Sequence, residues 1–397
     1  MKSKRIIFIV ETTFNKRDYK RYGVETLTSR GLYVEIWDFS YFLNSNYCKN
    51  YTVPDPISVS SCRIFNNKKE VLSVLLELDN KKDTIFSLFT VKRKTKFIFN
   101  YFVNNAINFG FLSLGVIPSI QFRLSILQRI KNNIKKPKYL FKIFYERLLN
   151  YSRKRYFANF FIVGGDVAKI KAKQSKYYNE KSIIINAHAF DYDLYLEEKK
   201  SVTKRILEGK YAVMLDEYNL YHPDNLISGS TVNPKTYYRD LNNFFKYLED
   251  YYGIDIVIAA HPRSHSEKLE NSYGGRKKVY GKTIHLIKNS EMVLTHASTA
   301  LNFGVLYNKP IIFLTSNDYS ITYKNSINFA AKALLKSPID VSTAKFSKTN
   351  YLEINEESYK LFIKLFIKSP NTAEISLWNI FANFIESKEN NNSGYFN

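Results

Sequence analysis

Residues 292–314 read MVLTHASTALNFGVLYNKPIIFL, and their pattern is the clearest indication of the fold. It predicts a strand, a polar turn, a helix at 298–307 and, after a proline, a second apolar strand. Strand, helix and strand in this order are typical of a parallel sheet, whose ligands bind at the carboxyl ends of the strands. Ser298 is expected to cap the helix, where free amides and the helix dipole favour a phosphate. His296, Ser298 and Thr299 are therefore predicted to bind a nucleotide phosphate, with an ordinary capped helix as the alternative.

The same alternation of strands and helices extends along the whole chain. A chain of 397 residues is expected to form two domains, and a charged stretch near 192–204 without apolar periodicity is expected to separate them. We therefore predict two α/β domains with parallel, doubly wound sheets, at residues 1–200 and 205–397. Further strands are expected at 6–10, 33–39, 57–64, 84–89, 111–114, 160–163, 182–185, 211–215 and 255–260, and further helices at 15–29, 68–78, 234–252, 356–367 and 372–387.

The chain is strongly basic, since 59 lysines and arginines stand against 36 acids, a formal charge of +23. Such an excess favours anionic partners, although a lysine-rich composition can also have no specific partner. The excess concentrates in residues 121–157, where eleven basic residues accompany one acid and apolar residues recur near helical spacing. These basic amphipathic helices are expected either to contact an anionic membrane or to pack on the sheet as ordinary surface helices.

The cysteine count and the apolar runs bear on the compartment. Cys48 and Cys62 alone provide neither a disulfide framework nor a paired metal motif. The apolar run at 6–10 is too short for a signal peptide or a membrane span. We therefore expect a cytoplasmic protein, either free or peripheral on the inner face of the membrane. No metal site is predicted, because Asp191 and Asp193 form only a short acidic pair and no zinc-like spacing occurs.

A second polar signal follows the apolar strand in IVIAAHPRS, residues 256–264. Pro262 fixes a turn and ends the strand. His261 and Arg263 therefore lie where ligands bind in an open α/β sheet. The sequence predicts that both contact a phosphate or a departing nucleotide oxygen, although a lone histidine is often structural.

A third signal is the pair Asp216 and Glu217, at the carboxyl tip of the strand at 211–215. A partly desolvated carboxylate there can act as a general base or as a nucleophile. A solvated acidic turn is the alternative. Lys282 lies in a basic turn at 281–283 that is expected to close over phosphates, while glycine-rich dinucleotide and Walker motifs are absent.

The order of these motifs resembles a known group of enzymes. An acidic strand end at 216–217, His-Pro-Arg at 261–263, His-Ala-Ser-Thr at 296–299 and Asn-Lys-Pro at 308–310 follow one another. This order is similar to the C-terminal domains of bacterial capsule and lipopolysaccharide glycosyltransferases. It is most similar to the sialyltransferase, polysialyltransferase and Kdo-transferase group, which uses CMP-activated ulosonic acids. The resemblance covers residues 211–315.

The resemblance implies a GT-B fold, in which two Rossmann-like domains face each other across a cleft and the last helix returns to the first domain. It also implies that the second domain holds the nucleotide and that catalysis needs no metal. Asp216 would be the catalytic carboxylate, His261 would assist the CMP leaving group, and Ser298 and Thr299 would bind its phosphate. Tyr218 stands where the sialyltransferase pattern has glycine, which leaves the role of Asp216 open.

Together these observations predict a glycosyltransferase that moves a sialic-acid-like sugar or Kdo from a CMP-activated donor to a surface glycan or lipid-linked acceptor, without a cofactor. The alternatives are a glycosyltransferase or epimerase that uses a UDP- or GDP-sugar, and a non-enzymatic protein that binds nucleic acid or membranes through charge alone. A nucleic-acid partner is not expected. The predicted catalytic residues are Asp216, Glu217 and His261, and the predicted nucleotide-binding residues are His261, Pro262, Arg263, Lys282, His296, Ser298 and Thr299.

Overall fold

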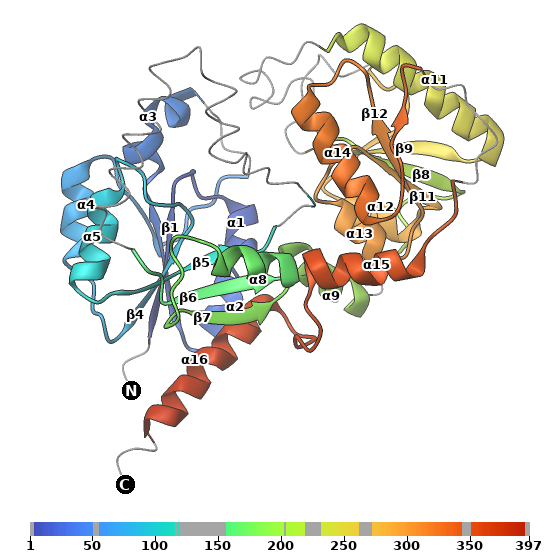
Figure 1. Cartoon of the computed structure of the whole chain (residues 1–397). Coiled ribbons are helices and arrows are strands. Elements are labelled where there is room, and N and C mark those ends of the chain that lie inside the picture. Colours follow the sequence, from blue (N-terminus) through green and yellow to red (C-terminus); the bar gives the residue numbers. More distant parts are fainter. Residues whose placement is uncertain are drawn as a thin grey trace, which may run out of the picture.

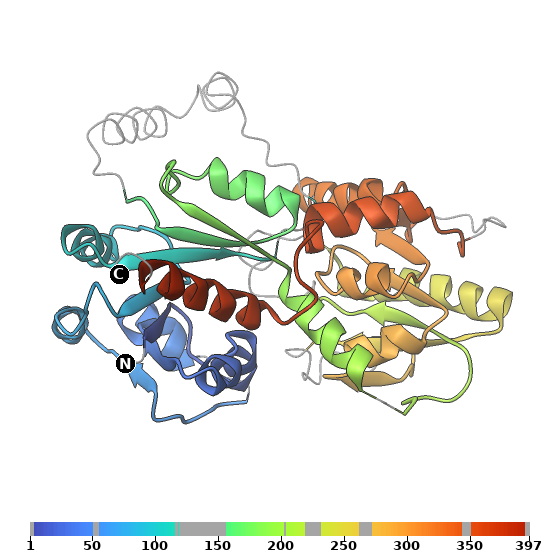
Figure 2. The same ribbon diagram turned by 90° about the horizontal axis from the view of Figure 1, so that it is seen from below.

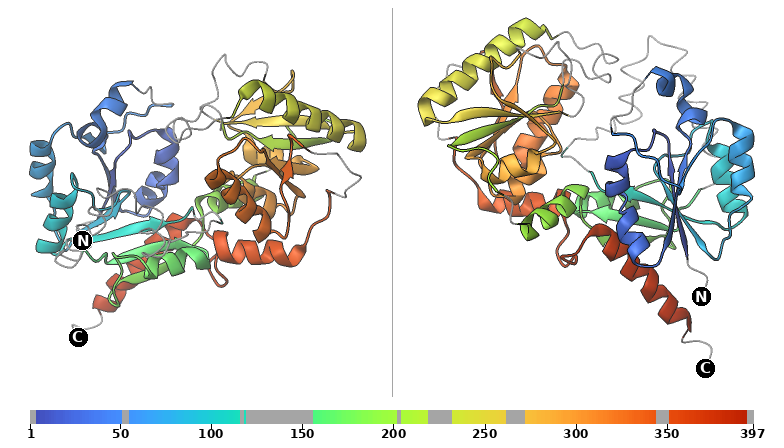
Figure 3. Two further views of the ribbon diagram at one scale, coloured as in Figure 1. Left: turned by 45° about the horizontal axis from the view of Figure 1, so that its top comes forward. Right: turned by 180° about the vertical axis from the view of Figure 1, so that it is seen from behind.

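The computed structural model describes residues 4–50, 55–115, 118, 156–201, 204–218, 232–261, 272–343 and 351–393. These residues form two α/β domains that lie side by side, each built on a parallel sheet (Figures 1 and 3). The first sheet has the order β3 (Cys62–Ile64), β2 (Tyr33–Asp38), β1 (Arg5–Val10), β4 (Asp83–Ser87), β5 (Asn108–Ser113), β6 (Phe160–Gly164) and β7 (Ile183–Ala187). The second has the order β10 (Lys278–Tyr280), β9 (Asp255–Ala260), β8 (Tyr211–Leu215), β11 (Met292–Thr295), β12 (Ile311–Thr315) and β13 (Ile339–Asp340).

Helices cover both faces of the first sheet because alternate residues of its strands point to opposite sides. Ile7 and Ile9 of β1 pack with α4 (Lys68–Leu75), α5 (Lys96–Asn104) and α8 (Asp166–Lys173). Ile6 and Phe8 pack with α2 (Val24–Ser29) and with the last helix, α16 (Leu377–Ser393). Two further helices of this domain, among its described residues, are α1 (Lys16–Arg21) and α3 (Ser40–Asn50).

The second domain has one continuous core around its sheet. The strongly amphipathic helix α11 (Pro234–Tyr252) contributes Phe244 and Phe245, both fully buried. Its start is capped by the side chain of Asn233, which accepts from the amide of Lys235. In the described part of the chain, this domain also has α9 (Phe190–Lys200), α12 (Thr283–Asn289), α13 (Leu301–Leu306), α14 (Ile321–Ala333), α15 (Glu356–Phe362) and the π-helix η2 (Ile363–Ile367).

The chain passes between the domains at two adjacent points. The first passage follows β7, and there Ala189 N donates to Ile367 O at 2.8 Å. The second passage follows η2, and there Lys368 forms an isolated antiparallel β-bridge with His188. Beyond it, α16 returns to the first domain, and Figure 2 shows it lying along that domain. Trp378 of α16 is buried against Phe8 and Phe86. Two Rossmann-like domains with a returning last helix form the GT-B architecture that the sequence predicts.

Several expected elements differ in detail from the observed ones. The single helix expected at 15–29 is two helices, α1 and α2, because Gly23 between them takes a left-handed conformation with φ of 56°. The charged stretch near 192–204 belongs mostly to α9, which packs on α12 and α13 of the second domain. The chain therefore passes between the domains at 188–189, earlier than the sequence indicates.

The basic helices expected at 121–157 lie almost entirely outside the described residues, which resume at 156. Within the described ranges, no helix has the length and apolar character that a membrane crossing requires.

Candidate functional site

Three neighbouring strands of the second sheet end in the polar residues that the sequence singles out. Because β9, β8 and β11 are parallel, their carboxyl ends meet at one edge of the sheet. Asp216 and Glu217 follow β8, His261 follows β9, and His296 follows β11. The fold thus brings together residues that lie as far apart in the chain as 216 and 296.

Asp216 connects the ends of β8 and β9. It is 8% exposed. Its Oδ1 accepts from the Tyr273 hydroxyl at 2.9 Å and from the Tyr218 amide at 2.8 Å, while Oδ2 accepts from the His261 amide at 3.3 Å. Tyr218, with a φ of 54°, lies nearly parallel to the His261 ring. The turn after the carboxylate pair is therefore built around Asp216, and Oδ2 carries the longer of its bonds.

Glu217 binds two backbone amides of the turn that follows β11, ahead of the helix start whose amides the sequence assigns to a phosphate. Its Oε1 accepts from the backbone amides of His296 at 3.1 Å and Ala297 at 2.8 Å, and its Oε2 accepts from the Tyr323 hydroxyl at 3.0 Å. Burial raises the pKa of Glu217 to about 7, although these hydrogen bonds favour the charged form. Glu217 can therefore exchange a proton close to neutral pH.

His296 is a buried, neutral histidine. Its Nε2 lies 2.6 Å from the Tyr237 hydroxyl and 3.3 Å from that of Tyr319. Burial lowers the pKa of His296 to about 3, and burial raises the pKa values of both tyrosines well above the ordinary value. The tyrosine hydroxyls thus remain protonated and can donate to Nε2, which places the imidazole proton on Nδ1. Nδ1 lies 3.8 Å from Glu217 Oε1 and has no hydrogen-bond partner among the described residues.

Ser298 does not cap a helix as expected. Helix α13 begins at Leu301, and its N-cap position is Ala300, which has a helical backbone and no side-chain cap. Ser298 Oγ instead accepts from the Ala300 amide at 3.3 Å, and the amides of Leu301 and Asn302 bond back to carbonyls of the same turn. These amides, together with those held by Glu217, are therefore not free for a phosphate.

The structure does not bring the remaining predicted binding residues together at one place. Thr299 is exposed at the same turn. Lys282 is exposed at the start of α12, beyond β10 at the far side of β9. Pro262 and Arg263 lie outside the described residues.

The carboxyl edges of the two sheets meet at a contact that sequence analysis missed. Arg21, on α1 after β1, lies with its guanidinium 4.3 Å from the centre of the Phe190 ring. Asp191 accepts from Asn302 of α13 at 2.9 Å. Burial raises the pKa of Asp191, against the hydrogen bond from Asn302 and the charges of Arg21 and Arg17. Spacing in the chain gives no signal for this contact, because its members come from three separate elements.

Asp191 and Asp193, the short acidic pair, point to different partners. Asp193 accepts from the Leu377 amide at 2.9 Å and lies 3.7 Å from the buried ring of His188. Across the described ranges, no group of three or more histidines, cysteines or acids is arranged to hold a metal ion.

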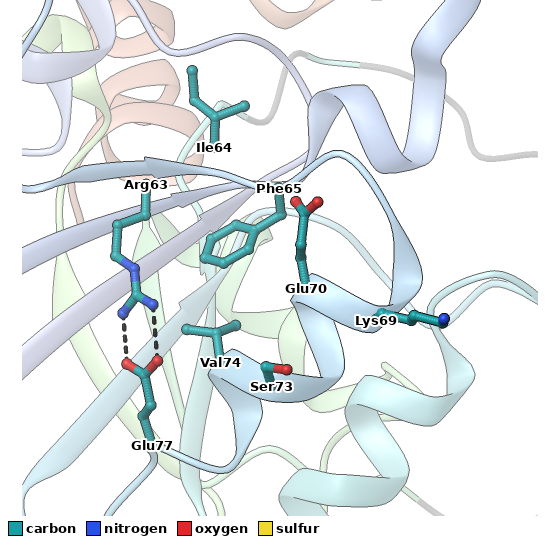
Figure 4. Close-up of a pocket in the computed structure, with 8 residues that line it drawn as sticks. All are labelled: Arg63, Ile64, Phe65, Lys69, Glu70, Ser73, Val74 and Glu77. Atoms are coloured by element: carbon teal, nitrogen blue, oxygen red, sulfur yellow. Dashed lines mark hydrogen bonds and ion pairs between the residues drawn. The ribbon is translucent and has the colours of Figure 1, made fainter.

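A groove of the first domain lies apart from these residues. It is formed by the edge strand β3 and by α4, and Figure 4 shows the side chains that line it. Arg63 and Glu77 form a two-pronged ion pair across it, with distances of 2.6 and 2.8 Å. None of the predicted site residues lines this groove.

Comparisons with known proteins place the chain only at the level of fold. It matches no protein-family model and no curated protein sequence. A UDP-GlcNAc 2-epimerase from Neisseria meningitidis bound to UDP-GlcNAc has a TM-score of 0.49 at 10% identity, over 97% of this chain and all of that one. The UDP-GlcNAc 2-epimerase from Methanocaldococcus jannaschii has a TM-score of 0.47 at 11% identity, over 96% and 99% of the two chains. The calicheamicin glycosyltransferase CalG4 has a TM-score of 0.42 at 10% identity, over 86% of each. At these identities and TM-scores, neither a substrate nor a residue role transfers to this chain.

Proposed function

We propose that this protein is a glycosyltransferase that binds a nucleotide sugar at the carboxyl edge of its second sheet. The observation that carries the proposal is the convergence of Asp216, Glu217, His261 and His296 at the ends of three adjacent strands. An open α/β sheet binds ligands at this edge, and a two-domain fold can close over donor and acceptor to exclude water.

The proposed donor is a CMP-activated ulosonic acid, and the acceptor is a surface glycan or a lipid-linked oligosaccharide. The support for this donor is the order of sequence motifs. A lipid-linked acceptor would suit the basic segment at 121–157, which we propose contacts an anionic membrane surface. No cofactor or metal is part of the proposal.

Asp216 is the proposed catalytic carboxylate. Two of the three hydrogen bonds it accepts from described groups go to Oδ1, so Oδ2 is the oxygen available to an acceptor hydroxyl. His261, whose amide donates to that same oxygen, would assist the nucleotide leaving group. Ser298 and Thr299 would contact the phosphate through their hydroxyls, because neighbouring amides already have partners.

Glu217 would respond to a bound phosphate through its charge. A phosphate at the adjacent turn would repel the charged carboxylate. Because the pKa of Glu217 is about 7, the carboxylate can take up one proton near neutral pH, and this removes the repulsion. We therefore propose that Glu217 is a positioning residue that takes up a proton when the nucleotide binds.

A second candidate function is a UDP-sugar epimerase. Glu217 and neutral His296 lie side by side, and a carboxylate with a pKa of about 7 suits the proton abstraction that an epimerase needs. An epimerase turns over its donor with no acceptor present, whereas a transferase does not. A purely electrostatic binder would need none of these strand-end residues.

Calorimetric titration with CMP, UDP and GDP tests the proposal. The proposed function predicts that CMP binds most tightly, and that His261→Ala and Ser298→Ala each weaken binding by about tenfold, the loss of one good polar contact. Preference for UDP, with donor turnover in the absence of an acceptor, would favour the epimerase. No nucleotide binding, together with salt-sensitive binding to nucleic acid or vesicles, would refute both enzyme proposals.

Asp216→Asn then separates the catalytic role from binding. The amide keeps an oxygen for the Tyr273 and Tyr218 bonds. It loses the 3.3 Å bond from the His261 amide, because its NH2 group cannot accept, and it cannot take up a proton. We expect nucleotide affinity to remain and sugar transfer to fall by about a hundredfold or more, as for loss of a general base. Unchanged transfer would remove Asp216 from the mechanism.

A further inference from the structure

The first domain has a second concave surface, at the edge of the sheet opposite the proposed nucleotide site. It is a pocket of about 420 Å³, a size that suits a small organic molecule. The residues that line it precede or begin β1, β4, β5, β6 and β7, so the pocket lies at the amino ends of these strands. They are Lys4, Asn80, Lys81, Lys82, Asp83, Thr84, Ala106, Asn108, Asn159, Phe160, Lys181 and Ile183, together with Phe381, Phe384 and Ile385 of α16.

The charge of this pocket is positive. Among the described residues that line it, four are lysines and Asp83 alone is an acid. The carboxylate of Asp83 is already held by the Arg5 guanidinium, at 2.9 and 2.5 Å, and by the Asp79 amide at 2.8 Å. Lys82 pairs with the Asp79 carboxylate at 3.0 Å.

Two of the lysines are available to a ligand. Lys81 and Lys181 are exposed and form no ion pair within the described part of the chain. Each sits in a turn whose backbone is fixed, because its amide donates to the side chain two residues before it, Asp79 or Asn179, at 2.8 and 3.0 Å. Lys81 precedes β4 and Lys181 precedes β7, so the two lysines flank the part of the pocket formed by β5 and β6.

Apolar side chains of α16 line part of the pocket and form its apolar wall. Phe381 and Ile385 are buried on α16, and Phe384 is half-buried beside them. Asn108 begins β5 and Asn159 precedes β6, the two strands between β4 and β7. Asn108 donates to the Thr84 hydroxyl at 3.0 Å, and Asn159 accepts from the Phe109 amide at 3.0 Å. A pocket lined by lysines and by apolar side chains of α16 fits a ligand that has an anionic head and an apolar body.

We infer that this pocket binds an organic phosphate or diphosphate that carries an alkyl or aromatic group. The lysines recognise the phosphate as point charges, and α16 receives the apolar group. The ligand is either a free metabolite or the headgroup of a phosphorylated lipid, since both present the same chemistry. The inference does not depend on the nucleotide site. The pocket lies at the amino ends of strands in the first domain, whereas the proposed nucleotide site lies at the carboxyl ends of strands in the second domain.

Geranyl diphosphate is a suitable probe, with inorganic pyrophosphate and geraniol as its two halves. We expect calorimetry to show that the full-length protein binds geranyl diphosphate at least about tenfold more tightly than either half. Binding should not compete with CMP or UDP. Equal affinity for pyrophosphate and geranyl diphosphate would overturn the role of the apolar wall.

The double variant Lys81→Ala/Lys181→Ala should weaken this binding by about tenfold or more, because two charge-assisted contacts are lost. Lys69→Ala/Lys173→Ala removes the same charge elsewhere in the first domain and should have no effect. Phe384→Ala should weaken geranyl diphosphate but leave pyrophosphate unchanged. Equal weakening in both double variants would show that binding depends on net charge alone and would overturn the inference.

Vesicles distinguish the two sources of ligand. If the ligand is a lipid headgroup, the wild-type protein should bind phosphatidylcholine vesicles that contain phosphatidate. The Lys81/Lys181 variant should lose this binding, and the Lys69/Lys173 variant should keep it. Binding of soluble geranyl diphosphate without vesicle binding would assign the pocket to a free metabolite. Binding of neither probe would refute the proposed site.

Discussion

The substitution Glu217→Gln tests the electrostatics of the proposed site directly. Glutamine has the same shape, its oxygen can accept from the His296 and Ala297 amides, and its amide group can donate to the Tyr323 hydroxyl. It cannot ionise. The variant therefore keeps the three hydrogen bonds and removes only the titration of the carboxylate.

The magnitude follows from the pKa of Glu217, which rises from 4.5 to about 7 on folding. Each unit of pKa corresponds to about 1.4 kcal/mol, so the charged carboxylate costs the fold about 3 kcal/mol. A raised pKa in an acid means that the folded state keeps its proton to higher pH than the unfolded state. The contribution of Glu217 to stability is therefore fully present below about pH 4.5 and is lost as the pH rises to about 7.

The measurement is the free energy of unfolding in urea, followed by circular dichroism, at about pH 5 and pH 8. The free energy of unfolding of Glu217→Gln, taken relative to that of the wild type, should rise by about 3 kcal/mol, within a factor of two, from pH 5 to pH 8. His296, whose pKa falls to about 3, gives the opposite pH dependence below about 6.5, but it is present in both proteins and cancels. Glu291→Gln, at an exposed glutamate of the same domain, controls for the loss of one charge. A difference between variant and wild type that does not change with pH would refute the assignment of a buried, easily protonated carboxyl.

Other predictions concern binding, the domain contact and the returning helix. If Glu217 takes up a proton when a nucleotide binds, calorimetry in buffers of different ionisation enthalpy should detect proton uptake near pH 7 in the wild type, and none in Glu217→Gln. Trp378→Ala removes a side chain packed on β1 and β4 and its bond to Arg21 O, and should lower the free energy of unfolding by about 3–5 kcal/mol, while Trp378→Phe should lower it less. Asn302→Ala leaves the partly buried carboxylate of Asp191 without that partner, and should cost about 1–3 kcal/mol in urea denaturation at neutral pH and less in acid. If the enzyme needs no metal, EDTA should leave sugar transfer unchanged, and a metal-restored loss of activity would contradict this.

The parallel sheets could be predicted because their central strands are continuous apolar runs. Those at 6–10, 211–215 and 292–295 are buried on both faces and bounded by polar turns. The gathering of Asp216, His261 and His296 follows from the same pattern, since each residue comes directly after such a strand. What the sequence could not supply was the choice of partners at that edge. Glu217 accepts from amides of the turn before the helix, while the Ser298 hydroxyl and two carbonyls of the same turn accept from amides at the helix start. Nothing in local spacing distinguishes such partners from a phosphate.

Helix α9 was missed for a related reason. Its sequence is charged and has no clear apolar period, but Glu198 is buried because Lys288 and His285 lie 2.9 and 2.7 Å from its carboxylate. A buried acid that is stabilised by partners from another element looks, in the sequence, like an exposed one. Long-range pairing of this kind also places Asp191 beside Asn302.

The two chain passages between the domains are bonded to each other as well as to the domains. Besides the bond from Ala189 N, Leu377 N donates to Asp193, and the Tyr192 hydroxyl donates to Glu374. A single linker would allow the domains to bend, swivel and separate, whereas two cross-bonded linkers leave one easy degree of freedom, bending about the line that joins them. The same geometry means that a protease cut in one linker would leave the halves of the molecule held together by the other.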